Sequence, residues 1–262
     1  MSAQVVRHRG GGKGRLPALA RRVLPLLIIF QVGLLSAAGA PGGGGVPTPA
    51  GMSVARLTRQ VEPSVVDTIT FADPAGTEIL GTGIIVSSSG LILTDYHVIR
   101  DDVFVGVRVG GAGEVRPATV VLTDPDHDLA LLEIQDALPL KPAELARTSS
   151  TAVGDPVLAI GNAMGLGQVP RAVAGRLVAL HRSVSYGVGS GTVDLDGVLE
   201  AEASIFAGDS GGALVDASGH VIGLIAAGSE GAPCAPGAIC PLHLAYAIPI
   251  HTALAQIGYT AL

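Results

Sequence analysis

Glycine and proline interrupt this sequence so often that they argue against a bundle of long helices. The chain has 37 glycines and 17 prolines among its 262 residues, with no Gly-X-Y period. So many turn-forming residues are typical of an all-β fold with many turns. Hydrophobic residues make up 48% of the chain, so it can bury a core and is not disordered as a whole. Because aromatic residues are only 3% and tryptophan is absent, that core must be aliphatic.

From residue 52 onward, short β-branched runs alternate with clusters of Gly, Pro, Asp and Ser. Twelve such runs predict an all-β fold, either a sandwich or barrels. The expected strands are residues 64–70, 83–86, 91–93, 103–109, 118–122, 130–134, 156–160, 171–180, 197–202, 213–215, 221–226 and 243–248. Helices are expected only over residues 54–60 and 250–257.

The front of the chain predicts export. Residues 1–22 carry six basic residues and no acidic one, and residues 23–40 are apolar and uncharged. A basic start, a short apolar region and small residues describe a secretory signal, and Pro25 argues against a buried helix. Cleavage after Ala38 stays open, but retention as an anchor is preferred, because 18 uncharged residues approach the ~20 that span hydrocarbon.

Either outcome places everything from residue 41 onward across the membrane, since basic residues stay on the cytoplasmic side. Residues 41–51 are rich in Gly and Pro and predict a flexible tether. Residues 52–262 are the expected folded domain. Beyond residue 22 the chain holds 10 basic and 22 acidic residues, a balance that would repel a phosphate backbone and argues against nucleic acid as a partner.

Three residues stand in segments that suit nucleophilic catalysis. His97 ends an apolar strand, Asp128 opens another, and Ser210 lies in a Gly-rich turn. A serine hydroxyl is a weak nucleophile and needs an adjacent base, and that base needs a carboxylate to fix its tautomer. Asp124 and Asp126 compete with Asp128 for the acid role on spacing alone.

The glycines beside Ser210 indicate an oxyanion hole. Tetrahedral intermediates need backbone N–H donors aimed at the developing negative charge. A turn without side chains around Gly208 and Ser210 lets their two amides point into one cavity. Gly211 and Gly212 allow a substrate backbone to come close.

On these residues the sequence resembles the trypsin-like serine peptidases, and within them the HtrA (Deg) branch. The resemblance covers nearly all of residues 52–262, and six motifs occur in the expected order. They are residues 81–86 followed by 90–94 and His97, residues 128–132, residues 159–162 with 165–167, residues 175–179, residues 208–212 and residues 245–249.

The resemblance implies two six-stranded antiparallel β-barrels, of the chymotrypsin or trypsin type, with the active site in the cleft between them. The barrels would cover residues 62–145 and 150–250. The resemblance also implies His97 as general base, Asp128 as its orienting partner and Ser210 as nucleophile. The family motif places the acid directly before Leu-Ala, which favours Asp128.

The oxyanion amides implied by the resemblance are those of Gly208 and Ser210, with Asp209 as a further donor. The implied primary substrate pocket consists of Ser204, Leu224, Ile225, Ala226 and Ala227. Ser204 stands where an acid would select basic side chains, so small or medium aliphatic residues are expected before the scissile bond. Glu202 nearby keeps a basic preference open.

The sequence departs from the HtrA pattern in three places. Only 13 residues follow Pro249, which leaves no room for the PDZ domain usual in the branch, so a catalytic domain alone is expected. Tyr96 is bulkier than the small residue common before the histidine. Asp209 replaces the usual Asn, and local hydrogen bonds are expected for it, because no Ile-Val-Gly-Gly-like start is present to pair with it.

Two cysteines, Cys234 and Cys240, lie in a Pro/Gly-rich insert before the last strand. In an exported chain this pair predicts a short loop-closing disulfide, with a free pair or a metal site near His243 as alternatives. The other histidines show no metal-ligand spacing. We therefore expect no metal and no cofactor.

Two functions remain open. The first is an exported serine endopeptidase that cleaves extracytoplasmic proteins or peptides. It would be anchored in the membrane facing outward, or secreted or periplasmic if its signal is cleaved. Its oligomeric state is left open. The second is a non-catalytic binding or chaperone-like protein on the same scaffold. An esterase would share the chemistry, but it would carry Gly-x-Ser-x-Gly within an α/β pattern, and that pattern is missing.

Overall fold

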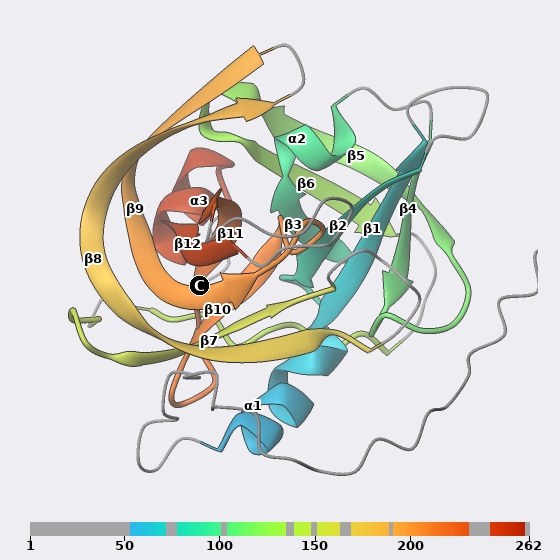
Figure 1. Cartoon of the computed structure of the whole chain (residues 1–262). Coiled ribbons are helices and arrows are strands. Elements are labelled where there is room, and N and C mark those ends of the chain that lie inside the picture. The colour runs from blue at the N-terminus through green and yellow to red at the C-terminus, as the bar shows by residue number, and fades with distance from the viewer. Residues whose placement is uncertain are drawn as a thin grey trace, which may run out of the picture. The chain divides into compact units, whose positions relative to one another are not determined.

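Two closed, six-stranded antiparallel β-barrels form the folded part of the chain in the computed structural model (Figure 1). The structure describes residues 53–71, 78–100, 104–134, 139–147, 151–162, 169–188, 191–230 and 242–259. The predicted all-β fold is confirmed, and barrels are found rather than a sandwich.

The first barrel, drawn in blue and green in Figure 1, joins its strands in the order β1-β2-β3-β6-β5-β4. Their bounds are β1 Val65–Phe71, β2 Glu78–Ile85, β3 Leu91–Asp95, β4 Phe104–Val109, β5 Arg116–Asp124 and β6 Leu129–Ile134. The second barrel follows the order β10-β11-β12-β9-β8-β7. Its strands are β7 Pro156–Gly161, β8 Arg171–Val188, β9 Gly191–Ile205, β10 Gly212–Asp216, β11 Val221–Glu230 and β12 Leu242–Pro249.

Short helices lie between and beside the strands. They are α1 (Val54–Val61), η1 (Glu62–Ser64), α2 (Tyr96–Ile99), η2 (Pro125–His127) and α3 (Ile250–Gln256). Ser53 caps α1 by accepting the N–H of Arg56, and the helix buries Leu57 and Val61. Among the described residues, no helix is both long and apolar enough to cross a membrane. The predicted anchor at residues 23–40 and the cysteine pair lie outside the described residues and stay predictions.

An aliphatic core fills both barrels, as the composition requires. Ile84, Leu93 and Leu129 of the first barrel share one continuous buried cluster with Leu158 and Ile160 of the second, and all five are fully buried. Each such side chain contributes about 1.5–3 kcal/mol by leaving water. The two barrels therefore fold against each other through a common core.

Each of the twelve predicted strands is present, but β8 and β9 run far beyond their predicted ends. They form one long hairpin whose register shifts between Leu177 and Val184. His181 within it has a left-handed φ of 58°. Many side chains in the outer part of the hairpin are exposed or half-buried, so a search for apolar runs misses it. α2 was not predicted because it is a single turn.

A buried carboxyl ties the first barrel to the second. Asp67 on β1 is fully buried and accepts hydrogen bonds from Arg108 Nη1, at 3.0 Å, and from the side-chain amide of Asn162, which follows β7. The main-chain N–H of Asn162 donates to Thr82 Oγ1 over 2.9 Å. Burial raises the pKa of Asp67 to about 6, although the Arg108 guanidinium acts in the opposite direction.

The substitution Asp67→Asn tests this carboxyl. Between about pH 4 and pH 6 the folded chain keeps the Asp67 proton that the unfolded chain has released, so this group makes the free energy of unfolding fall as pH rises. The amide cannot ionise, so across this window the variant should gain stability relative to the parent, by at most ~3 kcal/mol. Urea unfolding of both proteins at several pH values measures the difference. A difference that stays constant, or shrinks as pH rises, contradicts the expectation.

Candidate active site

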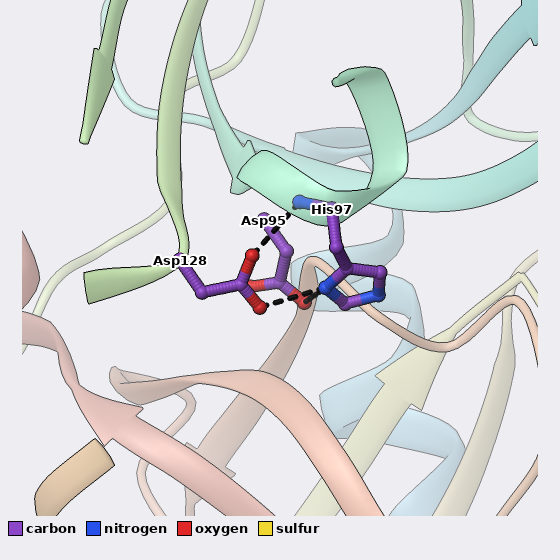
Figure 2. Close-up of side chains that lie close together, drawn as sticks. All are labelled: Asp95, His97 and Asp128. Atoms are coloured by element: carbon purple, nitrogen blue, oxygen red, sulfur yellow. Dashed lines mark hydrogen bonds and ion pairs between the residues drawn. The ribbon is translucent and has the colours of Figure 1, made fainter. Parts of the chain in front are cut away.

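His97 and Asp128 are held together by two hydrogen bonds (Figure 2). His97 Nδ1 lies 2.7 Å from Asp128 Oδ2, and the main-chain N–H of His97 donates to Oδ1 over 2.8 Å. The pairing of β3 with β6 brings the two residues together, because Asp95 at the end of β3 lies opposite Leu129 at the start of β6. With Nδ1–H donating to Asp128, the other ring nitrogen is the basic one. Figure 2 shows it turned away from both carboxyl groups drawn there.

Asp128, rather than Asp124 or Asp126, contacts the histidine. The Asp124 carboxyl binds the neighbouring His127 instead, with 2.6 Å between Oδ2 and Nδ1. Asp128 itself adopts a left-handed conformation, with φ 54°, at the end of η2. Such conformations are uncommon outside glycine and cluster at functional sites.

Tyr186 of the second barrel is a member of this site that the sequence did not reveal. Its hydroxyl donates to Asp128 Oδ2 over 2.6 Å, and its ring meets the His97 ring edge-on with 6.3 Å between centroids. Burial and the carboxyl groups of Asp95 and Asp128 raise the pKa of this phenol far above its ordinary value, so it stays a donor. It lies on the unpredicted part of β8, 58 residues from Asp128, and no sequence pattern marks it.

Ser210 follows a tight turn between β9 and β10. The amide of Asp209 donates to the carbonyl of Phe206 over 3.0 Å, and Gly208 has a φ of 96°, which fits a type II turn. The Asp209 carboxylate accepts the Phe206 amide at 2.8 Å, the kind of local hydrogen bond predicted for it. Because its amide is already bonded to Phe206, Asp209 is not the further oxyanion donor that the resemblance implied.

Thr82 on β2 holds the Ser210 turn, residues 206–211, against the first barrel. Its N–H donates to the carbonyl of Ser210, and its hydroxyl donates to the carbonyl of Gly208, each over 2.7 Å. On the other side, the N–H of Gly211 donates to Asp95 Oδ2 over 2.8 Å, and that oxygen lies 4.0 Å from His97 Nδ1. The turn is thus bonded to the strand that leads to His97.

Comparison with known proteins gives a consistent result. Residues 81–224 match the trypsin-like peptidase domain. The chain belongs to the trypsin-like peptidase family. It is of the HtrA type, which confirms the resemblance found in its motifs.

Two curated relatives and one solved structure illustrate the family likeness. The serine protease PepD of Mycobacterium tuberculosis (strain ATCC 25618 / H37Rv) is 35% identical over 236 residues, which cover 84% of this chain and 49% of PepD. The periplasmic pH-dependent serine endoprotease DegQ of Escherichia coli (strain K12) is 36% identical over 148 residues, 56% of this chain and 31% of DegQ. The HtrA-type protease AlgW, solved with a tripeptide, has a TM-score of 0.64 and 31% identity over 78% of this chain and 62% of that chain. This chain thus spans about half the length of PepD.

Two glycines of the family motifs leave no room for a side chain. A Cβ on Gly211 would collide with the carbonyl of Thr82, and the φ of 82° there is left-handed. A Cβ on Gly161, at the end of β7, would meet Oδ1 of Asp209. The Ser210 turn is therefore packed directly against backbone of both barrels.

Among the described residues, one group of potential metal ligands is present: Asp95, His97 and Asp128. Two ligands of a tetrahedral zinc ion lie about 3.3 Å apart. The 2.7 Å between His97 Nδ1 and Asp128 Oδ2 is that of a hydrogen bond and is too short for two such ligands.

Tyr186→Phe tests the link between the barrels at this site. The variant loses a hydrogen bond to the buried carboxyl group of Asp128, so the free energy of unfolding should fall by about 1.5–3 kcal/mol in urea unfolding at neutral pH. Tyr246→Phe is the control, since within the described residues the Tyr246 hydroxyl makes no hydrogen bond. A similar loss in both variants would contradict a specific role for the Tyr186 hydroxyl.

Proposed function

We propose that this chain is a serine endopeptidase in which His97 is the general base, Asp128 orients it and Ser210 is the nucleophile. One observation carries the proposal: the two-bond contact between His97 and Asp128 is built on the same strand end, β3, to which the Ser210 turn is bonded. Relatives at 34–36% identity are named serine proteases or endoproteases, which supports the same activity.

The proposed reaction uses the free nitrogen of His97. Nε2 takes the proton of the Ser210 hydroxyl while Oγ attacks the scissile carbonyl, and the imidazolium then gives this proton to the leaving amine. Asp128 keeps the proton on Nδ1 and stabilises the cation through the 2.7 Å contact. Water then hydrolyses the acyl-enzyme by the same route.

The oxyanion would be bound by the amides of Gly208 and Ser210. Within the described residues neither amide donates to a protein acceptor, whereas the Asp209 amide between them does. The positive φ of Gly208 orients this peptide unit at no steric cost. Losing one such donor lowers the rate by roughly 10²–10³-fold in other peptidases.

Substrate would bind along β11. This strand pairs with β10 only as far as Ile225, so among the described residues its edge beyond Ile225, next to the Ser210 turn, is free to pair with an extended peptide. The expected pocket residues on and near this strand are mostly buried: this holds for Leu224, Ile225 and Ala226, whereas Ser204 on β9 is half-buried. The Glu202 carboxylate is bound by Arg176 at 2.7 Å, which leaves small or medium aliphatic residues as the proposed preference.

We place the activity outside the cytoplasm, with residues 52–262 as the catalytic domain. DegQ and DegP of Escherichia coli are described as periplasmic, and AlgW has been solved with a tripeptide. The basic residues 1–22 and the apolar residues 23–40 supply the export segment in this chain. From both observations we infer that the substrates are proteins or peptides on the far side of the membrane.

The proposal predicts that a fluorophosphonate probe labels the full chain, solubilised in detergent, on Ser210, and that the chain cleaves casein. Ser210→Ala should abolish labelling and lower cleavage by about 10⁶-fold. Ser218→Ala, in the exposed turn after β10, is the matched control and should keep both. A parent protein that is folded by circular dichroism yet unlabelled would overturn the proposal and favour the non-catalytic alternative.

A further inference from the structure

A second carboxyl group faces the His97–Asp128 pair, and the proposed reaction does not use it. Asp95 is the last residue of β3 and is fully buried. Its Oδ2 accepts the amide N–H of Gly211 at 2.8 Å and lies 4.0 Å from His97 Nδ1 (Figure 2). The Gly211 N–H also faces the carbonyl of Ile225 at 2.8 Å, so Asp95 receives only part of this donor.

The hydrogen-bond donors of the site are divided unequally between the two acids. Asp128 accepts the main-chain N–H and Nδ1–H of His97 and the hydroxyl of Tyr186. Asp95 accepts the shared amide of Gly211, and its Oδ1 is buried without a partner among the described residues. Hydrogen bonds donated to a carboxylate favour its charged form, whereas burial without them favours the neutral acid. The negative charge of the site therefore belongs on Asp128.

We propose that Asp95 is held as a neutral carboxylic acid and acts as a positioning residue, joining the amide beside Ser210 to the end of β3, from which the chain enters the helix that carries His97. This inference rests on the proposed peptidase function. A neutral acid can accept from Gly211 without placing a second negative charge beside Asp128. When Asp95 ionises, its carboxylate repels that of Asp128 and competes with it for His97 Nδ1, which lies 4.0 Å from Asp95 Oδ2, so the His97–Asp128 pair is disturbed.

The groups around Asp95 agree with this assignment. Facing it are Asp128 before β6, His97 in α2 and Tyr186 on β8, and within the described residues no Lys or Arg forms an ion pair with it. Burial, followed by the charge of Asp128, raises the pKa of Asp95 well above its ordinary range, and the Gly211 hydrogen bond offsets this only in part. Because its pKa is raised, Asp95 keeps its proton to a higher pH than an ordinary aspartate does, as the proposal requires.

The protonation of Asp95 can be measured without relying on activity. In the full chain labelled with ¹³C at aspartate carboxyl carbons, one resonance should remain at the neutral-acid position at about pH 8, where ordinary aspartates are ionised. This resonance should disappear in Asp95→Asn and persist in Asp67→Asn, because the pKa of Asp67 is raised only to about 6. If the resonance lost in Asp95→Asn lies at the ionised position at this pH, the proposal is wrong, whether or not Ser210 reacts.

The positioning role has its own readout, the pH profile of kcat/KM for casein-derived peptides. The parent should lose activity at alkaline pH, and Asp95→Asn, which stays neutral, should lack that decline. Asp95→Ala removes an acceptor for Gly211 and should lower kcat about tenfold at neutral pH, so the Asn variant should rescue the Ala variant. An Asn variant that keeps the alkaline decline of the parent, or that is no better than the Ala variant, would overturn the positioning role.

Discussion

Thr82 makes the contact on which the rest of the site depends. Its N–H and hydroxyl hold the carbonyls of Ser210 and Gly208, both at 2.7 Å, while its own carbonyl accepts the hydroxyl of Thr94 on β3. The Thr82 hydroxyl also accepts the amide of Asn162 from the second barrel. One buried threonine thus bonds the Ser210 turn, the strand that leads to His97 and the end of β7. A hydroxyl can donate once and accept as well, which is why a threonine suits this position.

The electrostatics of the site follow from the same packing. Asp128 collects three donors from two different elements, α2 and β8, whereas Asp95 shares one amide. With two carboxyl groups this close to one imidazole in a buried setting, a second negative charge costs free energy, so charging both is unfavourable. Because Asp128 receives more hydrogen-bond donors than Asp95, the negative charge belongs on Asp128. His97, the proposed base, therefore has a single negatively charged partner.

Much of this site could be predicted from the sequence, because strand patterns and short motifs are local. His97, Asp128 and Ser210 each stand in a run whose residue types reveal them, and the strands around them were found for the same reason. The choice of Asp128 over Asp124 and Asp126 could come only from the family motif, since spacing did not separate them. Tyr186 was missed because it reaches Asp128 from a hairpin of the other barrel. Asp95 stood in the predicted strand, but its burial beside Asp128 depends on the pairing of β3 with β6.

We propose that the Ser210 turn, fixed by Thr82 and Asp95, presents its serine to His97. The most direct test is a crystal structure of the full chain after reaction with diisopropyl fluorophosphate. The expected result is a phosphorus atom bonded to Ser210 Oγ, its phosphoryl oxygen within hydrogen-bond distance of the Gly208 and Ser210 amides, and His97 Nε2 on the side of Oγ. An adduct on another residue, or a phosphoryl oxygen turned away from both amides, would contradict the account.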